Sequence, residues 1–96
     1  MKTTHDTKKN CIDLFTDDGA HVGEIEYMRG GNNELFATHT EVFKGNEGKG
    51  YGSRLVDALA DYAAETGAII KPVCPFVKAL FQRKPQKYAK VISRQK

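Results

Sequence analysis

The sequence predicts a single α+β domain with a mixed, mostly antiparallel sheet. Residues 10–43 alternate apolar and polar side chains between turn signals, which is typical of strands. Residues 55–63 repeat apolar side chains at helical spacing. Four glycines, at positions 45, 48, 50 and 52, separate the two regions. A chain of 96 residues can bury one modest core, so one domain is expected.

The beginning of the chain carries no periodic pattern. Residues 1–7 are therefore expected to be a disordered N-terminus, and the domain is expected to span residues 8–96. No apolar run reaches the length of a membrane span, and the first residues lack the apolar core of a signal peptide. A cytoplasmic protein without a membrane partner is expected.

Three strands are predicted before the glycines. The stretches 10–16 and 21–28 alternate in polarity, and the turn signal Asp17–Gly19 between them predicts an antiparallel hairpin. After a second turn at 29–33, the β-branched and aromatic residues of 34–43 predict the third strand.

A helix, a short strand and a second helix are predicted after the glycines. Gly67 suits the end of the first helix, and 68–73 is apolar enough for a buried strand. Pro75 suits the first turn of the second helix, and Pro85 interrupts it. Strand, glycine loop, helix and strand form a βαβ unit, so its two strands are expected to be parallel. The apolar residues at helical spacing in the first helix are Leu55, Val56, Leu59, Tyr62 and Ala63.

The composition gives limited information on partners. The net charge is +3, yet six basic residues and no acid follow from Arg83 onward. This segment is expected to be a solvated helix face or a positive rim for a phosphorylated ligand. Nucleic acid is not expected, because the charge is weak and aromatic residues are not interleaved with the basic ones. Cys11 and Cys74 form no CxxC or zinc-type spacing, so no metal is expected, and Cys11 is interpreted as packing.

Two common glycine-loop motifs do not fit. A P-loop needs a glycine where Phe43 stands, and Ser or Thr where Gly50 follows Lys49. A GxGxxG motif needs glycine at Ser53, and the chain is too short for two nucleotide-binding halves. Glycines directly before a helix are typical of backbone amides that hold an anion.

Residues Glu34–Ile92 resemble the small single-domain branch of the GNAT acyltransferase superfamily, the minimal predicted N-acetyltransferases. The resemblance lies in HTEV at the end of a strand, GKGYGSRLV at the loop and helix, PVCPF at the next strand end, and a late proline before Tyr88. It implies the GNAT fold and an acyltransferase that uses acetyl-coenzyme A on an amine that the sequence does not identify. Two alternatives stay open: a non-catalytic acyl-coenzyme A binding module, and a small RNA-associated protein that uses the basic C-terminal face.

The resemblance also implies how the cofactor is held. The backbone amides of Gly48–Ser53 would bind the pyrophosphate, and the pantetheine arm would bond to the main chain near Val42. Lys84, with two other basic residues, would meet the 3′-phosphate. Glu47 departs from the Gln or Arg usual in the superfamily, which is unfavourable for binding an anion. The expected cofactor-binding residues are Val42, Gly48, Lys49, Gly50, Tyr51, Gly52, Ser53, Lys78 and Arg83.

The resemblance places the thioester between His39, Glu41 and Cys74. Cys74 precedes a helix, where thiol pKa values are lowered, so it is either a nucleophile or a buried apolar residue. His39, expected on one face with Ala37 and Glu41, is a general base, an activator of Cys74 or a strand histidine; Glu41 is a second candidate base. Acetyl transfer is then either direct or through Cys74. The late Tyr88 is expected to pack in the core, with protonation of the leaving thiolate as the alternative.

Overall fold

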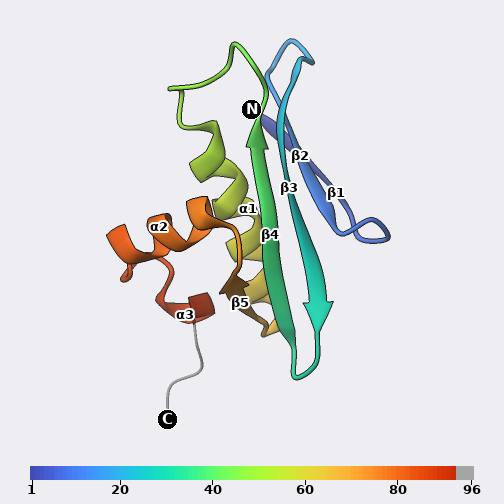
Figure 1. Ribbon diagram of the computed structural model, residues 1–96. Helices are drawn as coiled ribbons and strands as arrows, with labels where there is room; N and C mark the ends of the chain where they lie inside the picture. The colour runs from blue at the N-terminus through green and yellow to red at the C-terminus, as the bar shows by residue number, and fades with distance from the viewer. Residues whose placement is uncertain (93–96) are drawn as a thin grey trace.

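One five-stranded sheet organises the protein in this computed structural model, which describes residues 1–92 (Figure 1). The strands lie in the order β1-β2-β3-β4-β5, with the first four antiparallel and β5 parallel to β4. This arrangement confirms the predicted α+β fold and its parallel βαβ unit. The elements are β1 (Lys2–Asp6), β2 (Cys11–Phe15), β3 (His21–Gly30), β4 (Glu34–Val42), α1 (Tyr51–Thr66), β5 (Ile69–Pro72), α2 (Pro75–Arg83) and α3 (Ala89–Ile92).

The two faces of the sheet differ in character. Alternate residues of β2 and β3, such as Ile12 and Ile25, are buried beneath α1, which contributes Leu55 and Leu59 to the same core. The opposite face, called here the open face, carries the polar residues between them. In Figure 1, α1 passes behind the strands and α2 lies beside β4 and β5. None of the helices in residues 1–92 is both long and apolar enough to span a membrane.

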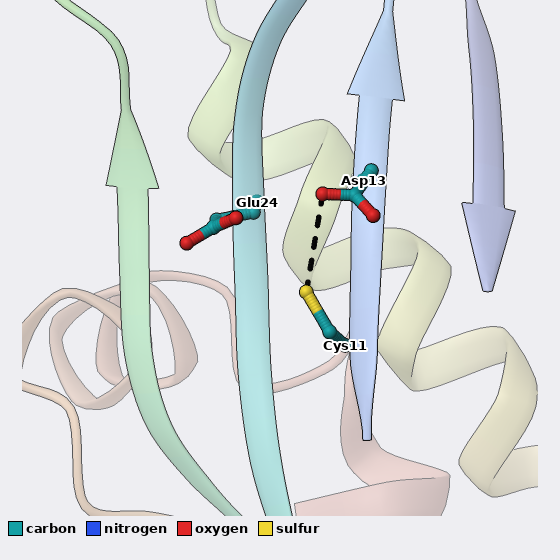
Figure 2. Close-up of side chains that lie close together, drawn as sticks. All are labelled: Cys11, Asp13 and Glu24. Carbon is teal, nitrogen blue, oxygen red and sulfur yellow. Dashed lines mark hydrogen bonds between the residues drawn. The ribbon is translucent and has the colours of Figure 1, made fainter. Parts of the chain in front are cut away.

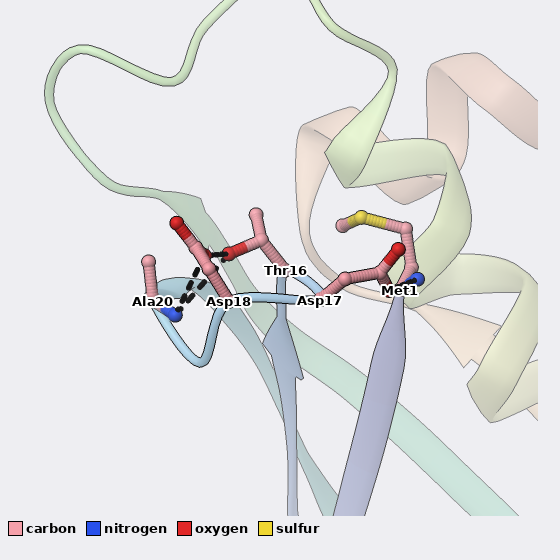
Figure 3. A network of polar contacts seen from close by, with 5 residues as sticks. All are labelled: Met1, Thr16, Asp17, Asp18 and Ala20. Carbon is pink, nitrogen blue, oxygen red and sulfur yellow. Dashed lines mark hydrogen bonds and ion pairs between the residues drawn. The ribbon is translucent and has the colours of Figure 1, made fainter.

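The N-terminus corrects one expectation. Residues Lys2–Asp6 form β1, paired antiparallel with β2, instead of a disordered segment. Its side chains are mostly exposed, so the apolar periodicity that reveals a buried strand is absent from the sequence. The Met1 ammonium group binds Asp17 at 2.5 Å beside the β2–β3 turn, where Thr16, Asp18 and Ala20 are joined by further hydrogen bonds (Figure 3).

The helix boundaries follow the signals in the sequence. Gly67 ends α1 in the left-handed conformation, with φ 74° and its N–H directed to the Ala63 and Ala64 carbonyls. Pro75 occupies the first turn of α2, and Pro85 lies between α2 and α3. These helix ends confirm the predicted boundaries. They could be predicted from the sequence because each depends on local backbone chemistry.

A β-bulge in β4 changes which side chains reach the core. Glu26 pairs with His39, but Tyr27 pairs with Ala37, so Thr38 is an extra residue in the ladder. The bulge reverses the alternation: Ala37 is buried on the core face, whereas His39 lies opposite Glu26 on the open face. The expectation that His39 and Ala37 share a face is therefore wrong.

The parallel strands part halfway along β4. Their pairing ends at Ala37 and Pro72, where the Ala37 carbonyl accepts hydrogen bonds from Val73 N (3.1 Å) and Cys74 N (2.8 Å). The chain then turns into α2, and residues 38–42 of β4 have no strand beside them on that side. The open end of β4 thus lies close to the start of α1 and the start of α2.

Candidate functional site

The glycine loop ends in a helix N-terminus with free N–H groups. Gly45, Gly48 and Gly50 have φ values of 90°, 79° and 78°, which residues with side chains rarely adopt. Gly50 is the N-cap of α1, with no side-chain cap, and Arg54 N donates to Gly50 O at 3.2 Å in the first turn. The N–H groups of residues 51–53 therefore have no partner within the helix and are available to an anion.

The loop residues before the helix are tied to one another. Gly45 N donates to the Glu47 carboxylate at 2.9 Å, and the Asn46 side-chain amide donates to the Phe43 carbonyl at 3.3 Å. The Glu47 carboxylate, the departure from the superfamily pattern, thus stabilises the turn at Gly45. This contact gives the acid a structural role in the loop.

A pocket of about 260 Å³ joins the glycine loop to the end of β4. Phe76 from α2 forms one wall, and a Cβ built on Gly52 would come within 2.8 Å of its ring. Phe76 was not among the expected site residues, because an apolar residue near a helix start is ordinarily core. Its exposed fraction of 41% is the distinguishing feature, and it is visible only in the structure. The pocket is lined by Val42, residues 46–48, residues 50–53 and Phe76.

The main chain of β4 offers hydrogen-bonding groups to this pocket. Phe43 N bonds to Val22 O at 2.9 Å, so the neighbouring residue Val42 forms a non-hydrogen-bonded pair with Gly23. Because the bonds alternate, the N–H and C=O of Val42 and Thr40 point away from β3, toward the side that β5 has left. An extended ligand arm can pair there as a strand would.

Cys74 lies at the inner end of the same region. It is buried at 7% exposure, occupies the N-cap of α2, and lies 3.7 Å from the Thr40 hydroxyl. Burial raises the pKa of the Cys74 thiol, but the backbone N–H of Val77, the Thr40 hydroxyl and two further backbone N–H groups outweigh it, so the pKa lies below its ordinary value. Thr40 was not among the expected residues, because the bulge that turns it toward the core cannot be read from alternation.

His39 and Glu41 form a separate pair on the open face. Their side chains are 53% and 50% exposed and lie 3.5 Å apart. Cys74 instead contacts Thr40, which lies between His39 and Glu41 on β4 and faces the core. The structure therefore brings His39 and Glu41 together but does not bring either into hydrogen-bond contact with Cys74.

The expected phosphate-binding residues are spread along α2. Lys78 is two residues, about half a turn, after Phe76, whereas Arg83 lies about 10 Å from Phe76 along the axis, at the end of the helix. Arg83 and Lys84 line a different, shallow pocket with residues 85–87. Arg94 and Lys96, the last members of the basic segment, lie outside the described residues.

Tyr88 packs in the core, as expected. It is 2% exposed, and its hydroxyl donates to Asp57 of α1 at 2.6 Å. Burial and this hydrogen bond raise the pKa of the Tyr88 phenol well above its ordinary value. The hydroxyl is therefore committed to α1, and it does not line the pocket at the glycine loop.

Cys11 lies on the open face and not in the core (Figure 2). The ligating atoms of Cys11, Asp13 and Glu24 lie within 4.8 Å of one another, with Cys11 and Asp13 on β2 and Glu24 on the adjacent β3. Burial and the neighbouring carboxylates raise the pKa of the Cys11 thiol to about 11. The thiol is thus protonated near neutral pH, which is the form that binds metals weakly.

The splayed parallel strands, with a glycine loop and helix N-terminus at their open end, define the acyltransferase fold that the sequence predicts. The chain belongs to the GCN5-related N-acetyltransferase family: the family model matches residues 12–91. It is accordingly an acyltransferase. No curated protein sequence is significantly similar to this chain.

Solved structures agree with this assignment. A GCN5-like protein from Staphylococcus aureus superposes with a TM-score of 0.74 and 26% identity, covering 99% of this chain and 90% of that one. Nourseothricin acetyltransferase superposes with a TM-score of 0.60 and 24% identity, covering 76% of this chain and 46% of its own. Tetrahymena GCN5 superposes with a TM-score of 0.63 and 14% identity, covering 90% of this chain and 61% of its own. The last two support the fold alone, and this chain spans about half to two thirds of their lengths.

Proposed function

We propose that this protein transfers an acetyl group from acetyl-coenzyme A to an amine. The observation that carries the proposal is the pocket where the free N–H groups of α1 meet the unpaired end of β4. A pyrophosphate needs hydrogen-bond donors and a positive dipole end, which the N-terminus of α1 supplies through residues 48–53. Lys49, exposed in the loop, adds a positive charge.

The remaining parts of the cofactor follow the strand. The pantetheine arm extends along β4 and bonds to the main-chain groups of Val42, in the place that a further strand would take. The ring of Phe76 packs against the arm from the other side. Of the basic residues of α2, Lys78 is nearer to Phe76 along the helix axis, and Arg83 reaches the 3′-phosphate only if the nucleotide lies along α2.

The thioester then lies at the edge of β4, where both faces of the sheet can reach it. On the core face Cys74 is a nucleophile that can accept the acetyl group. On the open face His39, supported by Glu41, is a general base for an incoming amine. The two routes of acetyl transfer are thus assigned to opposite faces of one strand, and separate substitutions can distinguish them.

Cofactor binding is tested first by calorimetric titration with coenzyme A, acetyl-coenzyme A and 3′-dephospho-coenzyme A. Binding of the first two is expected, with weaker binding of the third if basic side chains of α2 meet the 3′-phosphate. Gly50→Ala, which changes the N-cap backbone, is expected to weaken binding of all three ligands, and Lys90→Ala, on α3, serves as the control. Absence of binding at millimolar ligand would overturn the proposal.

Acetyl transfer is tested by mass spectrometry of the protein after incubation with acetyl-coenzyme A, together with turnover on amine substrates. Transfer through Cys74 predicts an acetyl adduct on that residue and loss of turnover in Cys74→Ala. Direct transfer predicts no adduct and loss of turnover in His39→Gln. Binding without turnover on any amine would instead indicate a non-catalytic acyl-coenzyme A binding module.

A further inference from the structure

The bulge in β4 selects the side chain that meets Cys74. If Thr38 were paired in the ladder instead of bulged, strict alternation from the buried Ala37 would place His39 on the core face. With the bulge, Thr40 lies opposite the fully buried Ile25. The Thr40 hydroxyl is 3.7 Å from the Cys74 sulfur, in a direct contact between β4 and the first residue before α2.

Cys74 is surrounded by hydrogen-bond donors. The hydroxyl and backbone N–H of Thr40 approach from β4, and the backbone N–H groups of Phe76 and Val77 approach from α2. The protonated thiol makes no cap hydrogen bond to the first turn of α2, and its own hydrogen is directed to Thr40. Donors arranged in this way favour the anionic sulfur over the neutral one.

Charged groups on the same elements lie elsewhere. On β4, His39 and Glu41 occupy the open face, opposite Thr40. On α2, the side chains of Lys78 and Arg83 are exposed, and only the backbone N–H of Lys78 reaches the Cys74 carbonyl, at 3.0 Å. On β4 and α2, the groups around the sulfur are therefore uncharged hydrogen-bond donors. One of these donors, the Thr40 hydroxyl, belongs to a side chain.

We propose that Thr40 is a positioning residue that stabilises the thiolate form of Cys74, the nucleophile for acyl transfer. This inference rests on the proposed function and on the route through Cys74. The thiol first releases its proton to solvent, and the Thr40 hydroxyl then donates its hydrogen to the sulfur anion. The hydroxyl holds the anion on the core side of β4, next to the edge where the thioester is placed.

The transfer itself is a thioester exchange. The Cys74 sulfur forms a bond to the acetyl carbonyl carbon, the bond from that carbon to the coenzyme A sulfur breaks, and coenzyme A leaves as a thiolate that takes a proton from water. In the second step the amine nitrogen attacks the acetyl carbon, the bond to Cys74 breaks, and the amine proton passes to solvent. Nothing is oxidised or reduced, and Cys74 returns to the thiolate state.

The test measures the ionisation of Cys74 by the ultraviolet absorbance of its thiolate. Cys11→Ser serves as the background, so that one cysteine remains, and Cys74→Ser in that background gives the reference spectrum for the tyrosines. Thr40→Val and Thr40→Ala remove the hydroxyl, and Thr40→Ser retains it. Thr38→Val is the matched control, because the Thr38 hydroxyl bonds to the Glu26 carbonyl at 3.3 Å and not to the sulfur.

Loss of the Thr40 hydroxyl is expected to lower the acid dissociation constant of Cys74 by about three- to tenfold. Thr40→Ser and Thr38→Val are expected to leave it unchanged. Unchanged ionisation in both Thr40→Val and Thr40→Ala, each confirmed as folded by circular dichroism, would overturn the proposal. An equal change in Thr38→Val would also overturn it, since the effect would then belong to the strand as a whole.

The role in transfer is tested by the rate of acetylation of Cys74 by acetyl-coenzyme A as a function of pH. Thr40→Val is expected to slow the reaction near neutral pH by the same factor and to recover at higher pH, where the thiol ionises unaided. A deficit independent of pH would indicate a merely structural role and overturn the proposal. If wild-type Cys74 is never acetylated although Thr40 changes its ionisation, the route through Cys74 fails while the thiolate contact stands.

Discussion

The contact between Gly52 and Phe76 links the stability of α1 to the shape of the pocket. Gly52 lies within α1, where alanine is favoured over glycine by about 1 kcal/mol. A Cβ at this position would meet ring atoms of Phe76 at 2.8, 3.0 and 3.5 Å. Ordinary carbon contacts lie at about 3.5–4.0 Å, so Gly52→Ala requires the ring to move by several tenths of an ångström or more.

The expected magnitude follows from these two opposing effects. Displacing a packed side chain costs about 1–3 kcal/mol, at the lower end here because Phe76 is 41% exposed and can turn into solvent. Gly52→Ala alone is therefore expected to lower the free energy of unfolding by about 0–2 kcal/mol. In a Phe76→Ala background the ring is gone, and the same substitution is expected to raise the free energy of unfolding by about 1 kcal/mol.

The assay is urea unfolding of the four proteins of this double-mutant cycle. A coupling energy of about 1–3 kcal/mol between the two positions is expected. Val73→Ala provides the control, because Val73 is similarly apolar and 60% exposed but is not among the closest neighbours of a Cβ at Gly52. If Gly52→Ala and Phe76→Ala prove additive within about 0.5 kcal/mol, the ring does not constrain Gly52 and the reasoning is refuted.

Three further predictions concern other parts of the molecule. Tyr88→Phe, which removes the hydrogen bond to Asp57, is expected to lower the free energy of unfolding by about 1–2 kcal/mol at pH 7. Because the folded-state pKa of Tyr88 is raised, this contribution is present below about pH 10 and is lost above it. The difference between the variant and the wild type in urea unfolding should therefore narrow as pH rises. Gly50→Ala is expected to cost about 1–2 kcal/mol of unfolding free energy and Gly50→Asn less, since asparagine tolerates the left-handed backbone; equal losses would contradict the φ-based argument. Cys11, with a pKa of about 11, is expected to resist alkylation at pH 7 and to react faster in Asp13→Asn, as peptide mass spectrometry would show; rapid alkylation in the wild type would disprove the assigned ionisation.

Local chemistry made much of the fold predictable from sequence. Gly67 and Pro75 mark helix ends through their own backbone preferences, so their positions could be predicted without knowledge of the tertiary structure. The glycine loop could be predicted in the same way, because backbone positions with positive φ, such as those of Gly48 and Gly50, favour glycine. Strand β1 escaped detection for the converse reason: its side chains are exposed, and pairing with β2 through the main chain leaves no periodic signal.

The arrangement of the candidate site was less predictable. Strict alternation placed His39 on a face with Ala37, but one unpaired residue, Thr38, exchanged His39 for Thr40 on the core face. A bulge depends on the pairing of two strands, and nothing within β4 alone indicates where the extra residue lies. Phe76 was likewise missed, because its role depends on the absence of a side chain at Gly52 in another helix.

The bulge also explains how one short strand can provide two different reactive groups. Beyond Ala37, β4 is an edge, so a ligand lying along it is accessible from the core face and from the open face. On the core face, Thr40 contacts the buried Cys74 thiol. On the open face, His39 and Glu41 are exposed titratable groups. Deleting Thr38 should therefore give a regular ladder in which His39 still lies opposite Glu26 and Thr40 still lies opposite Ile25. If Thr38 were instead kept and paired within a regular ladder, His39 would lie on the core face, where it would pair with the thiol as an acid–base couple, so the bulge decides whether donors or a base activate Cys74.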